Sequence, residues 1–165
     1  YEIASCLVGS EMCIRDRSRT EQVHIVMPGD VNSSFRLFGG LLMQWIDVVA
    51  AVVARRHADR EVLTAAVDHL SFLKPANLND IVTLCGRVTY VGNTSMEVCV
   101  ETFVERPERN NVRALVNRAY LTMVALDEDG KPTRVPRLKP VSEQEKVDFE
   151  AGRRRKEARK REPEG

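Results

Sequence analysis

The apolar positions of this chain change their period along the sequence, and each period is typical of a different element. Between residues 38 and 57 apolar side chains are almost continuous. Arg55, Arg56 and His57 end this run as cations that suit the negative end of a helix dipole. Farther along, apolar and polar residues alternate in "SMEVCVETFVE" (95–105), which is typical of a half-buried strand. The pattern therefore predicts one long helix followed by strands.

Turn residues divide the rest of the chain into further strand-like runs. Gly92-Asn93 is a hairpin signal directly before residues 95–105, and Pro75 stops the apolar run before it. Strands are expected in these runs and in one weaker run before the helix, at 21–27, 62–73, 81–91 and 112–126. The order of strand, long helix and antiparallel meander indicates an α+β fold with one sheet wrapped around one helix.

Both ends of the chain differ from its middle. Residues 1–17 lack a clear period and the long apolar stretch of a signal peptide, so we interpret them as a foreign segment or a disordered native extension. Residues 138–165 are strongly charged, and within them 141–162 are expected to form a solvated helix, with phosphate contact by its basic cluster as the alternative. The folded domain is therefore expected at 18–137.

Composition and charge exclude several classes of protein. The 165 residues are 43% hydrophobic and 30% charged, as in an ordinary globular domain. A net charge of +1 gives no general attraction to nucleic acid, and no apolar run reaches the roughly 18–20 residues of a membrane span. The four cysteines form no C-x-x-C pair, so we expect no metal site and a reducing, cytoplasmic location.

Asp47 is the position in the apolar helix that most needs an explanation. A charged group that is buried without a partner is costly, so such groups are usually paired or functional. On a helical wheel Asp47 shares a narrow face with Met43, Ala50, Ala51 and Ala54, while the larger side chains on the other faces suit a sheet surface. We expect this carboxylate in a tight, mostly dry seam, with a cap or a plain ion pair as the alternative.

Gly39 and Gly40 open the predicted helix. The first backbone N–H groups of a helix lack partners within it, so they can polarise a developing oxyanion. Gly40 and Asp47 share a face but lie roughly 10 Å apart at ~1.5 Å per residue, which is too far for both to act on one carbonyl. A second copy of the helix or a bound water would have to close this gap, so we expect a dimer whose sites draw on two chains.

The stretch "MPGDVNSSFRLFGGLLMQWIDVVAAVVARRH" (27–57) resembles the helix region of the hot-dog acyl-CoA thioesterases, the bacterial and cytosolic acyl-CoA hydrolases. Residues 64–75, 88–98 and 124–136 match in the same order, so the resemblance covers about residues 20–137. It implies a hot-dog fold of five or six antiparallel strands around the long helix. It also implies dimers, commonly assembled as trimers of dimers, that hydrolyse acyl-CoA without a resident cofactor, since CoA belongs to substrate and product.

The resemblance also implies roles for single residues. Asp47 matches the catalytic carboxylate, as general base for water or as nucleophile that forms a mixed anhydride. Gly40, with Gly39, matches the helix N-terminus that binds the thioester oxygen. Asn32 matches a loop residue that orients water or the thioester, with a turn role as the alternative. A turn near the CoA arm, or a plain hairpin turn, is expected at Gly92, Asn93, Thr94 and Ser95.

Other polar and aromatic residues are weaker candidates. Arg55 and Lys74 are candidates for contact with CoA phosphates, with surface solvation as the alternative. His57 fits the end of the helix and His69 a strand position, so both are expected to be structural. Trp45 is expected in the core rather than in the wall of an acyl pocket.

Two other functions stay open on the sequence. A non-catalytic acyl-CoA-binding sensor on the same fold would use the same pocket without needing Asp47. A related dehydratase is disfavoured, because such enzymes usually rely on a histidine near the helix start, and the nearest ones here are His24 and His57. Phe35 and Arg36 depart from the family pattern and could narrow the entrance or contact CoA.

Overall fold

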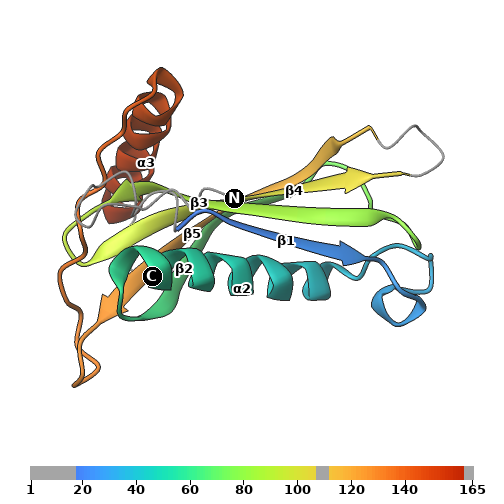
Figure 1. Cartoon of the computed structure of the whole chain (residues 1–165), viewed down its shortest axis with the longest axis horizontal. Coiled ribbons are helices and arrows are strands. Elements are labelled where there is room, and N and C mark those ends of the chain that lie inside the picture. The colour runs from blue at the N-terminus through green and yellow to red at the C-terminus, as the bar shows by residue number, and fades with distance from the viewer. Residues whose placement is uncertain (1–17, 107–111, 162–165) are drawn as a thin grey trace, which may run out of the picture.

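One long helix lies along one face of a five-stranded antiparallel sheet in the computed structural model, which describes residues 18–106 and 112–161 (Figure 1). The elements are β1 (Thr20–Ile25), the short 3-10 helix η1 (Pro28–Asp30), α2 (Gly39–Ala58), β2 (Glu61–Phe72), β3 (Ile81–Val91), β4 (Ser95–Glu105), β5 (Ala114–Leu126) and α3 (Glu143–Arg161). The predicted helix and all five predicted strands are confirmed within a few residues. The expectation for residues 1–17 lies outside the described residues.

The strand order is β1-β3-β4-β5-β2, and each neighbouring pair is antiparallel. β2 follows α2 in the chain and pairs with β5, so β1 and β2 form the two edges of the sheet within the described part of the chain. Figure 1 shows α2 beneath the sheet and α3 on the opposite side. This arrangement gives the sheet one face packed on α2 and one face that meets α3.

The core lies between α2 and the sheet. Leu42, Ile46, Val49 and Val53 of α2 are buried there, as the helical wheel predicts. Gly86 of β3 lets the helix come close, because a Cβ atom on it would lie 2.7 Å from Val49 Cγ1.

The helical wheel is wrong about the other faces of α2. Ala50 and Ala54 are fully buried in the core instead of lining the face of Asp47. Val48, which the wheel places against the sheet, is 46% exposed. The helix thus turns the face that carries its small alanines toward the sheet, and Val48 lies on the side away from the core.

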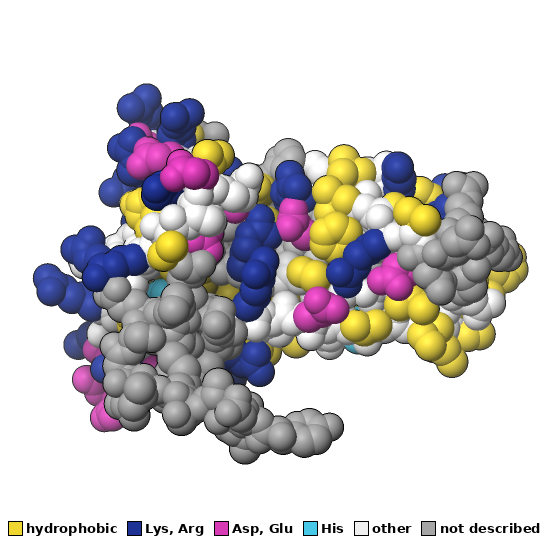
Figure 2. Space-filling view, turned by 45° about the horizontal axis from the view of Figure 1, so that its top comes forward, with side chains coloured by type: hydrophobic (Ala, Val, Ile, Leu, Met, Phe, Trp, Pro, Cys, Tyr) yellow, Lys and Arg dark blue, Asp and Glu magenta, His cyan; other side chains and the backbone are white. Residues whose placement is uncertain are grey.

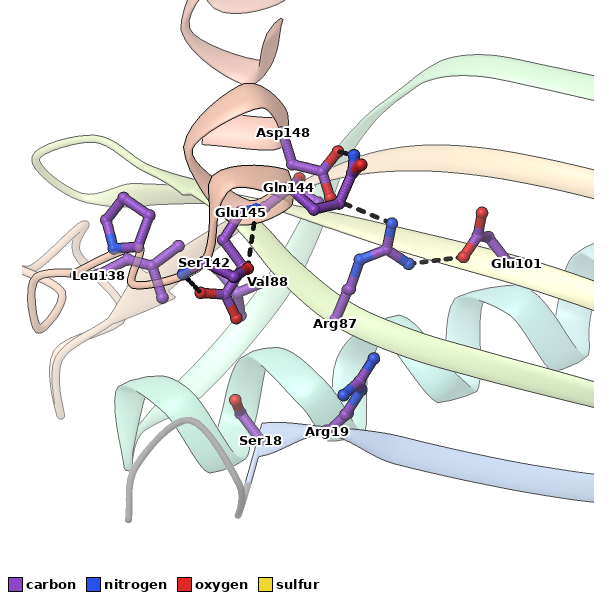
Figure 3. A pocket seen from close by; sticks show the side chains of 12 residues that line it. Ser18, Arg19, Arg87, Val88, Glu101, Leu138, Ser142, Gln144, Glu145 and Asp148 are labelled. Carbon is purple, nitrogen blue, oxygen red and sulfur yellow. Dashed lines mark hydrogen bonds and ion pairs between the residues drawn. The ribbon is translucent and has the colours of Figure 1, made fainter. Parts of the chain in front are cut away.

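α3 packs on the outer face of the sheet through ion pairs. Arg87 of β3 donates to Glu101 at 2.6 Å and to Asp148 of α3 at 3.2 Å, at the edge of a cavity of about 390 Å³ (Figure 3). Arg155 of α3 holds the buried carboxylate of Glu97 with two hydrogen bonds of 2.8 Å. The predicted helix in the tail is confirmed, but the face that meets the sheet is not solvated.

The exposed surface of α3 is densely charged, with cations and anions interleaved (Figure 2). Neither α2 nor α3, the long helices of the described ranges, combines the length and the hydropathy that a bilayer crossing would need.

Candidate active site

Asp47 lies on the side of α2 that faces the edge strand β2. Thr64 of β2 donates a hydrogen bond from Oγ1 to Asp47 Oδ1 at 2.6 Å, and the same hydroxyl lies 3.6 Å from the sulfur of Met123. None of the described cations forms an ion pair with Asp47, so the ion-pair alternative is not supported there. The carboxylate is oriented by a neutral hydroxyl group.

The single chain does not bury this carboxylate. Asp47 is exposed, because the outer edge of β2 has no neighbouring strand among the described elements. The prediction of a dry seam is therefore wrong for one chain alone. A seam around Asp47 would need a second chain along the edge of β2.

The N-terminus of α2 presents backbone donors that the helix itself does not use. The first N–H groups that donate within the helix are those of Leu41 and Leu42, both to the carbonyl of Phe38 at 3.0 and 3.1 Å. Phe38 gives no side-chain cap, and the first turn has no acidic residue. The N–H groups of Gly39 and Gly40 are therefore available to a ligand, and they carry the partial positive charge of the helix N-terminus.

Gly40 gives the Phe38 ring its place at this helix end. A Cβ atom on Gly40 would lie 2.6 Å from a ring carbon of Phe38, which is closer than real Cβ contacts. A larger residue would force the Phe38 ring to move. The glycine thus lets the Phe38 ring pack closely against the first turn of the helix.

Asn32 organises the loop that leads into α2. Its Oδ1 accepts hydrogen bonds from the backbone N–H of Ser34 at 2.9 Å and of Arg36 at 3.3 Å. This arrangement holds a turn in which Phe35 adopts a left-handed backbone with φ of 55°. The turn role of Asn32 is confirmed, and its contact with water or substrate stays a prediction.

A groove of about 320 Å³ lies beside the N-terminus of α2. Asn32, Arg36 and Lys74 contribute polar side chains to it. Its apolar walls come from the loop, the first turn of α2 and the ends of β2 and β5, through Leu37, Leu42, Phe72, Leu73 and Val116. Asn32, Lys74 and the helix start thus lie at one end of the fold, as an acyl or CoA site would require.

The remaining predicted residues lie at the other end of the sheet. The turn Gly92–Ser95 follows β3, which runs for 11 residues, or roughly 35 Å at ~3.3 Å per residue. Arg55, in the last turn of α2, forms an exposed ion pair with Glu61 at 3.1 Å. One chain therefore does not bring Arg55 and this turn to Gly40.

The histidine and tryptophan predictions concern packing. His57 is buried and its Nε2 lies 3.0 Å from the carbonyl of Pro136, and burial lowers its pKa. The side chain of His69 lies outside the described residues. Trp45 stacks on His24 with ring centroids 3.9 Å apart, and it packs against the core as predicted.

Thr64 is the residue that sequence reasoning missed. It opens the matched segment 64–75, but a threonine in a strand is an ordinary β-former, and no local pattern links it to a helix 17 residues earlier. The outer-face cavity of Figure 3 contains none of the predicted site residues. Within residues 18–106 and 112–161, no group of three or more His, Cys, Asp or Glu side chains could hold a metal ion.

Comparison with known proteins gives the family. The family described as "Thioesterase superfamily" matches residues 36–109. An uncharacterized acyl-CoA thioester hydrolase of Bacillus subtilis is 44% identical over 128 residues, which are 78% of this chain and 74% of that protein. The cytosolic acyl coenzyme A thioester hydrolase of Rattus norvegicus is 35% identical over 84% of this chain, but the match spans only 36% of that longer protein.

Solved structures agree with these relatives. An acyl-CoA hydrolase from Staphylococcus aureus, solved with butyryl coenzyme A and coenzyme A, is 39% identical with a TM-score of 0.83, and 88% of each chain is covered. Structures of that hydrolase include variants in which an aspartate, an asparagine or a threonine is replaced by alanine. A hexameric acyl-CoA thioesterase is 42% identical with a TM-score of 0.84, over 88% of this chain and 93% of that one. The chain therefore belongs to the thioesterase superfamily, among the hot-dog acyl-CoA thioester hydrolases.

Proposed function

We propose that this protein hydrolyses acyl-CoA thioesters with Asp47 as its catalytic carboxylate. The hydrogen bond from Thr64 to Asp47 carries the proposal, because it orients the carboxylate through a hydroxyl group and not through an ion pair. In the Staphylococcus aureus hydrolase, the replaced asparagine, aspartate and threonine follow one another at intervals of 15 and 17 residues. Asn32, Asp47 and Thr64 have the same spacing here, which supports their assignment to one site.

The reaction starts when the thioester carbonyl oxygen accepts hydrogen bonds from the N–H groups of Gly39 and Gly40. Asp47 removes a proton from water as the water attacks the carbonyl carbon, or its carboxylate attacks directly and water then hydrolyses the mixed anhydride. The negative charge that forms on the carbonyl oxygen is stabilised by the helix end. The C–S bond then breaks, the CoA sulfur takes a proton, and the free acid leaves.

Each site draws on two chains in this proposal. Gly40 and Asp47 of one helix are roughly 10 Å apart along the axis, so the carboxylate that serves one helix end comes from a neighbouring chain. The edge of β2 is the surface for this contact, since it exposes Leu63 and Val67 beside Asp47 and Thr64. The hexameric relative supports an assembly of dimers into a trimer of dimers.

The CoA part of the substrate extends toward basic side chains. Lys74 lies in the groove beside the helix start, and Arg55 with the turn Gly92–Ser95 lies at the far end of the same chain. In an assembled enzyme, Lys74 of one chain and Arg55 with this turn of another can face the CoA phosphates. A cytoplasmic location fits a relative named as cytosolic.

The Asp47→Asn variant tests the mechanism. Thiol release from acyl-CoA should fall by about 10²–10⁴-fold in kcat, because the amide cannot accept a proton or act as a nucleophile. Asp59→Asn is the matched control: Asp59 caps the other end of α2, so its variant should keep full activity. Unchanged kcat in Asp47→Asn would exclude this mechanism. Saturable acyl-CoA binding without thiol release by the wild-type protein would instead favour the acyl-CoA-binding sensor.

A further inference from the structure

The groove beside the N-terminus of α2 has a polar floor. Thr102 of β4 lines this groove and Asn117 of β5 lies directly opposite it in the sheet, and both are fully buried. Neither Thr102 Oγ1 nor Asn117 Oδ1 has a hydrogen-bond partner among the described residues. Buried polar atoms in native proteins are almost always satisfied, so two unpaired neighbours, one of which lines the groove, point to a ligand group.

A β-bulge lies directly beside this pair. The pairing of β4 with β5 skips from Thr102 opposite Asn117 to Phe103 opposite Leu115, so Val116 is an extra residue on β5. Val116 is buried and also lines the groove. Bulges redirect side chains and are common next to active sites. Here the bulge brings an apolar wall and the polar floor together.

The two unpaired atoms differ in what they can bind. The Nδ2 group of Asn117 donates to the carbonyl of Ser71 at 2.7 Å, which fixes the amide and leaves Oδ1 as an acceptor. The Thr102 hydroxyl can donate and accept. A ligand hydroxyl satisfies both atoms, because it donates to Asn117 Oδ1 and accepts from Thr102. A carboxylate would bring negative charge against Oδ1, and an alkyl end would leave both atoms unpaired.

The rest of the groove fits an acyl chain. Most of its walls are apolar, and it begins where Leu37 and Leu42 flank the two glycines that would bind the thioester oxygen. We propose that this groove receives the acyl group and that Thr102 and Asn117 select acyl-CoA substrates whose acyl chain carries a hydroxyl group. This inference rests on the proposed thioesterase function and adds the chemical class of its substrate.

A substrate series tests the inference. Thiol release is measured for butyryl-, hexanoyl- and octanoyl-CoA and for the 3-hydroxy and ω-hydroxy form of each. For at least one chain length and hydroxyl position, the ratio of kcat/KM for the hydroxylated substrate to kcat/KM for the plain substrate should be about ten in the wild-type protein. This is expected because the plain substrate leaves a buried polar group unpaired. Thr102→Val removes the hydroxyl at nearly constant volume, and it should bring this ratio close to one by improving the plain substrate.

Thr83→Val is the matched control, because Thr83 is a buried threonine on β3 that does not line the groove. It should keep the wild-type ratio. The inference would be overturned if the wild-type protein hydrolysed no hydroxylated substrate better than its plain counterpart. It would also be overturned if Thr102→Val left the preference in kcat/KM unchanged. Either result would indicate that the floor holds only a structural water. The same would follow from a preference for acyl groups that end in a carboxylate.

Binding separates this inference from the proposed function. Non-hydrolysable thioether analogues of the same plain and hydroxylated series are titrated into the wild-type protein and Thr102→Val, and Kd is measured by calorimetry. A tenfold preference in Kd that Thr102→Val removes would support the polar floor even if no thioester were hydrolysed. Hydrolysis of plain acyl-CoA without any such preference would retain the thioesterase and reject the floor as its selector.

Discussion

Replacing Thr64 by valine removes one hydroxyl group while nearly preserving the shape of the side chain. The hydroxyl donates to Asp47 at 2.6 Å, and a hydrogen bond to a charged group contributes about 1.5–3 kcal/mol. If this bond holds the carboxylate in its reactive orientation, its loss should lower kcat by roughly 10–100-fold, since about 1.4 kcal/mol corresponds to tenfold in rate. Thr64 would then be a positioning residue that acts through Asp47.

The assay measures kcat and KM for thiol release by the wild-type protein, Thr64→Val and Thr64→Ser. Serine keeps the hydroxyl, so it should retain most of the activity, and KM should change little in both variants because substrate binding does not need Asp47. In the double variant with Asp47→Asn, Thr64→Val should add almost no further loss, since residues that act as a unit are not additive. Full kcat in Thr64→Val, or equal damage by Thr64→Ser, would refute the positioning role.

Three further predictions concern stability, measured as the free energy of unfolding in urea. Gly86→Ala should cost about 1–3 kcal/mol, because its Cβ would lie 2.7 Å from Val49 Cγ1, whereas a stable variant would show that the helix shifts freely. Arg155→Ala should cost about 2–4 kcal/mol by leaving the carboxylate of Glu97, which is 4% exposed, without its cation, and Arg155→Lys should recover part of this loss. The buried His57 has a pKa below 6.5 in the folded chain, so the unfolded chain binds protons more readily and stability should fall as the pH drops below about 6.5. His57→Gln should weaken this dependence, and an unchanged pH profile would contradict it.

The elements of this fold are largely predictable from the sequence because their signals are local. The apolar run of α2, the alternation in β4 and the Gly92-Asn93 turn each determine one element, and the structure confirms them. The rotation of α2 was predicted less well. Burial of Ala50 and Ala54 depends on how closely the helix approaches Gly86, and this distance depends on the sheet rather than on the helix sequence.

The candidate site divides in the same way. Asp47 and Gly40 stand out as candidates because a charge in an apolar helix and glycines at its start are visible in the sequence as single anomalies. Thr64 was not found, because its role depends on the position of β2 beside α2. The exposure of Asp47 is hard to predict for a similar reason. The sequence of α2 shows on which face of the helix Asp47 lies, but it does not show which other element or chain covers that face.

The polar floor shows how much the alternation of apolar and polar residues along a strand can predict. In β4 the pattern correctly places Thr102 on the face shared by Val98 and Val100, where a lone threonine is unremarkable in a sheet. Its importance comes from Asn117, which stands opposite it only because of the register of β4 with β5 and the bulge at Val116. A shift by one residue would turn Asn117 to the other face, where its amide could reach water. The unpaired pair is therefore a property of the register, and the substrate it selects follows from the fold as much as from the two residues.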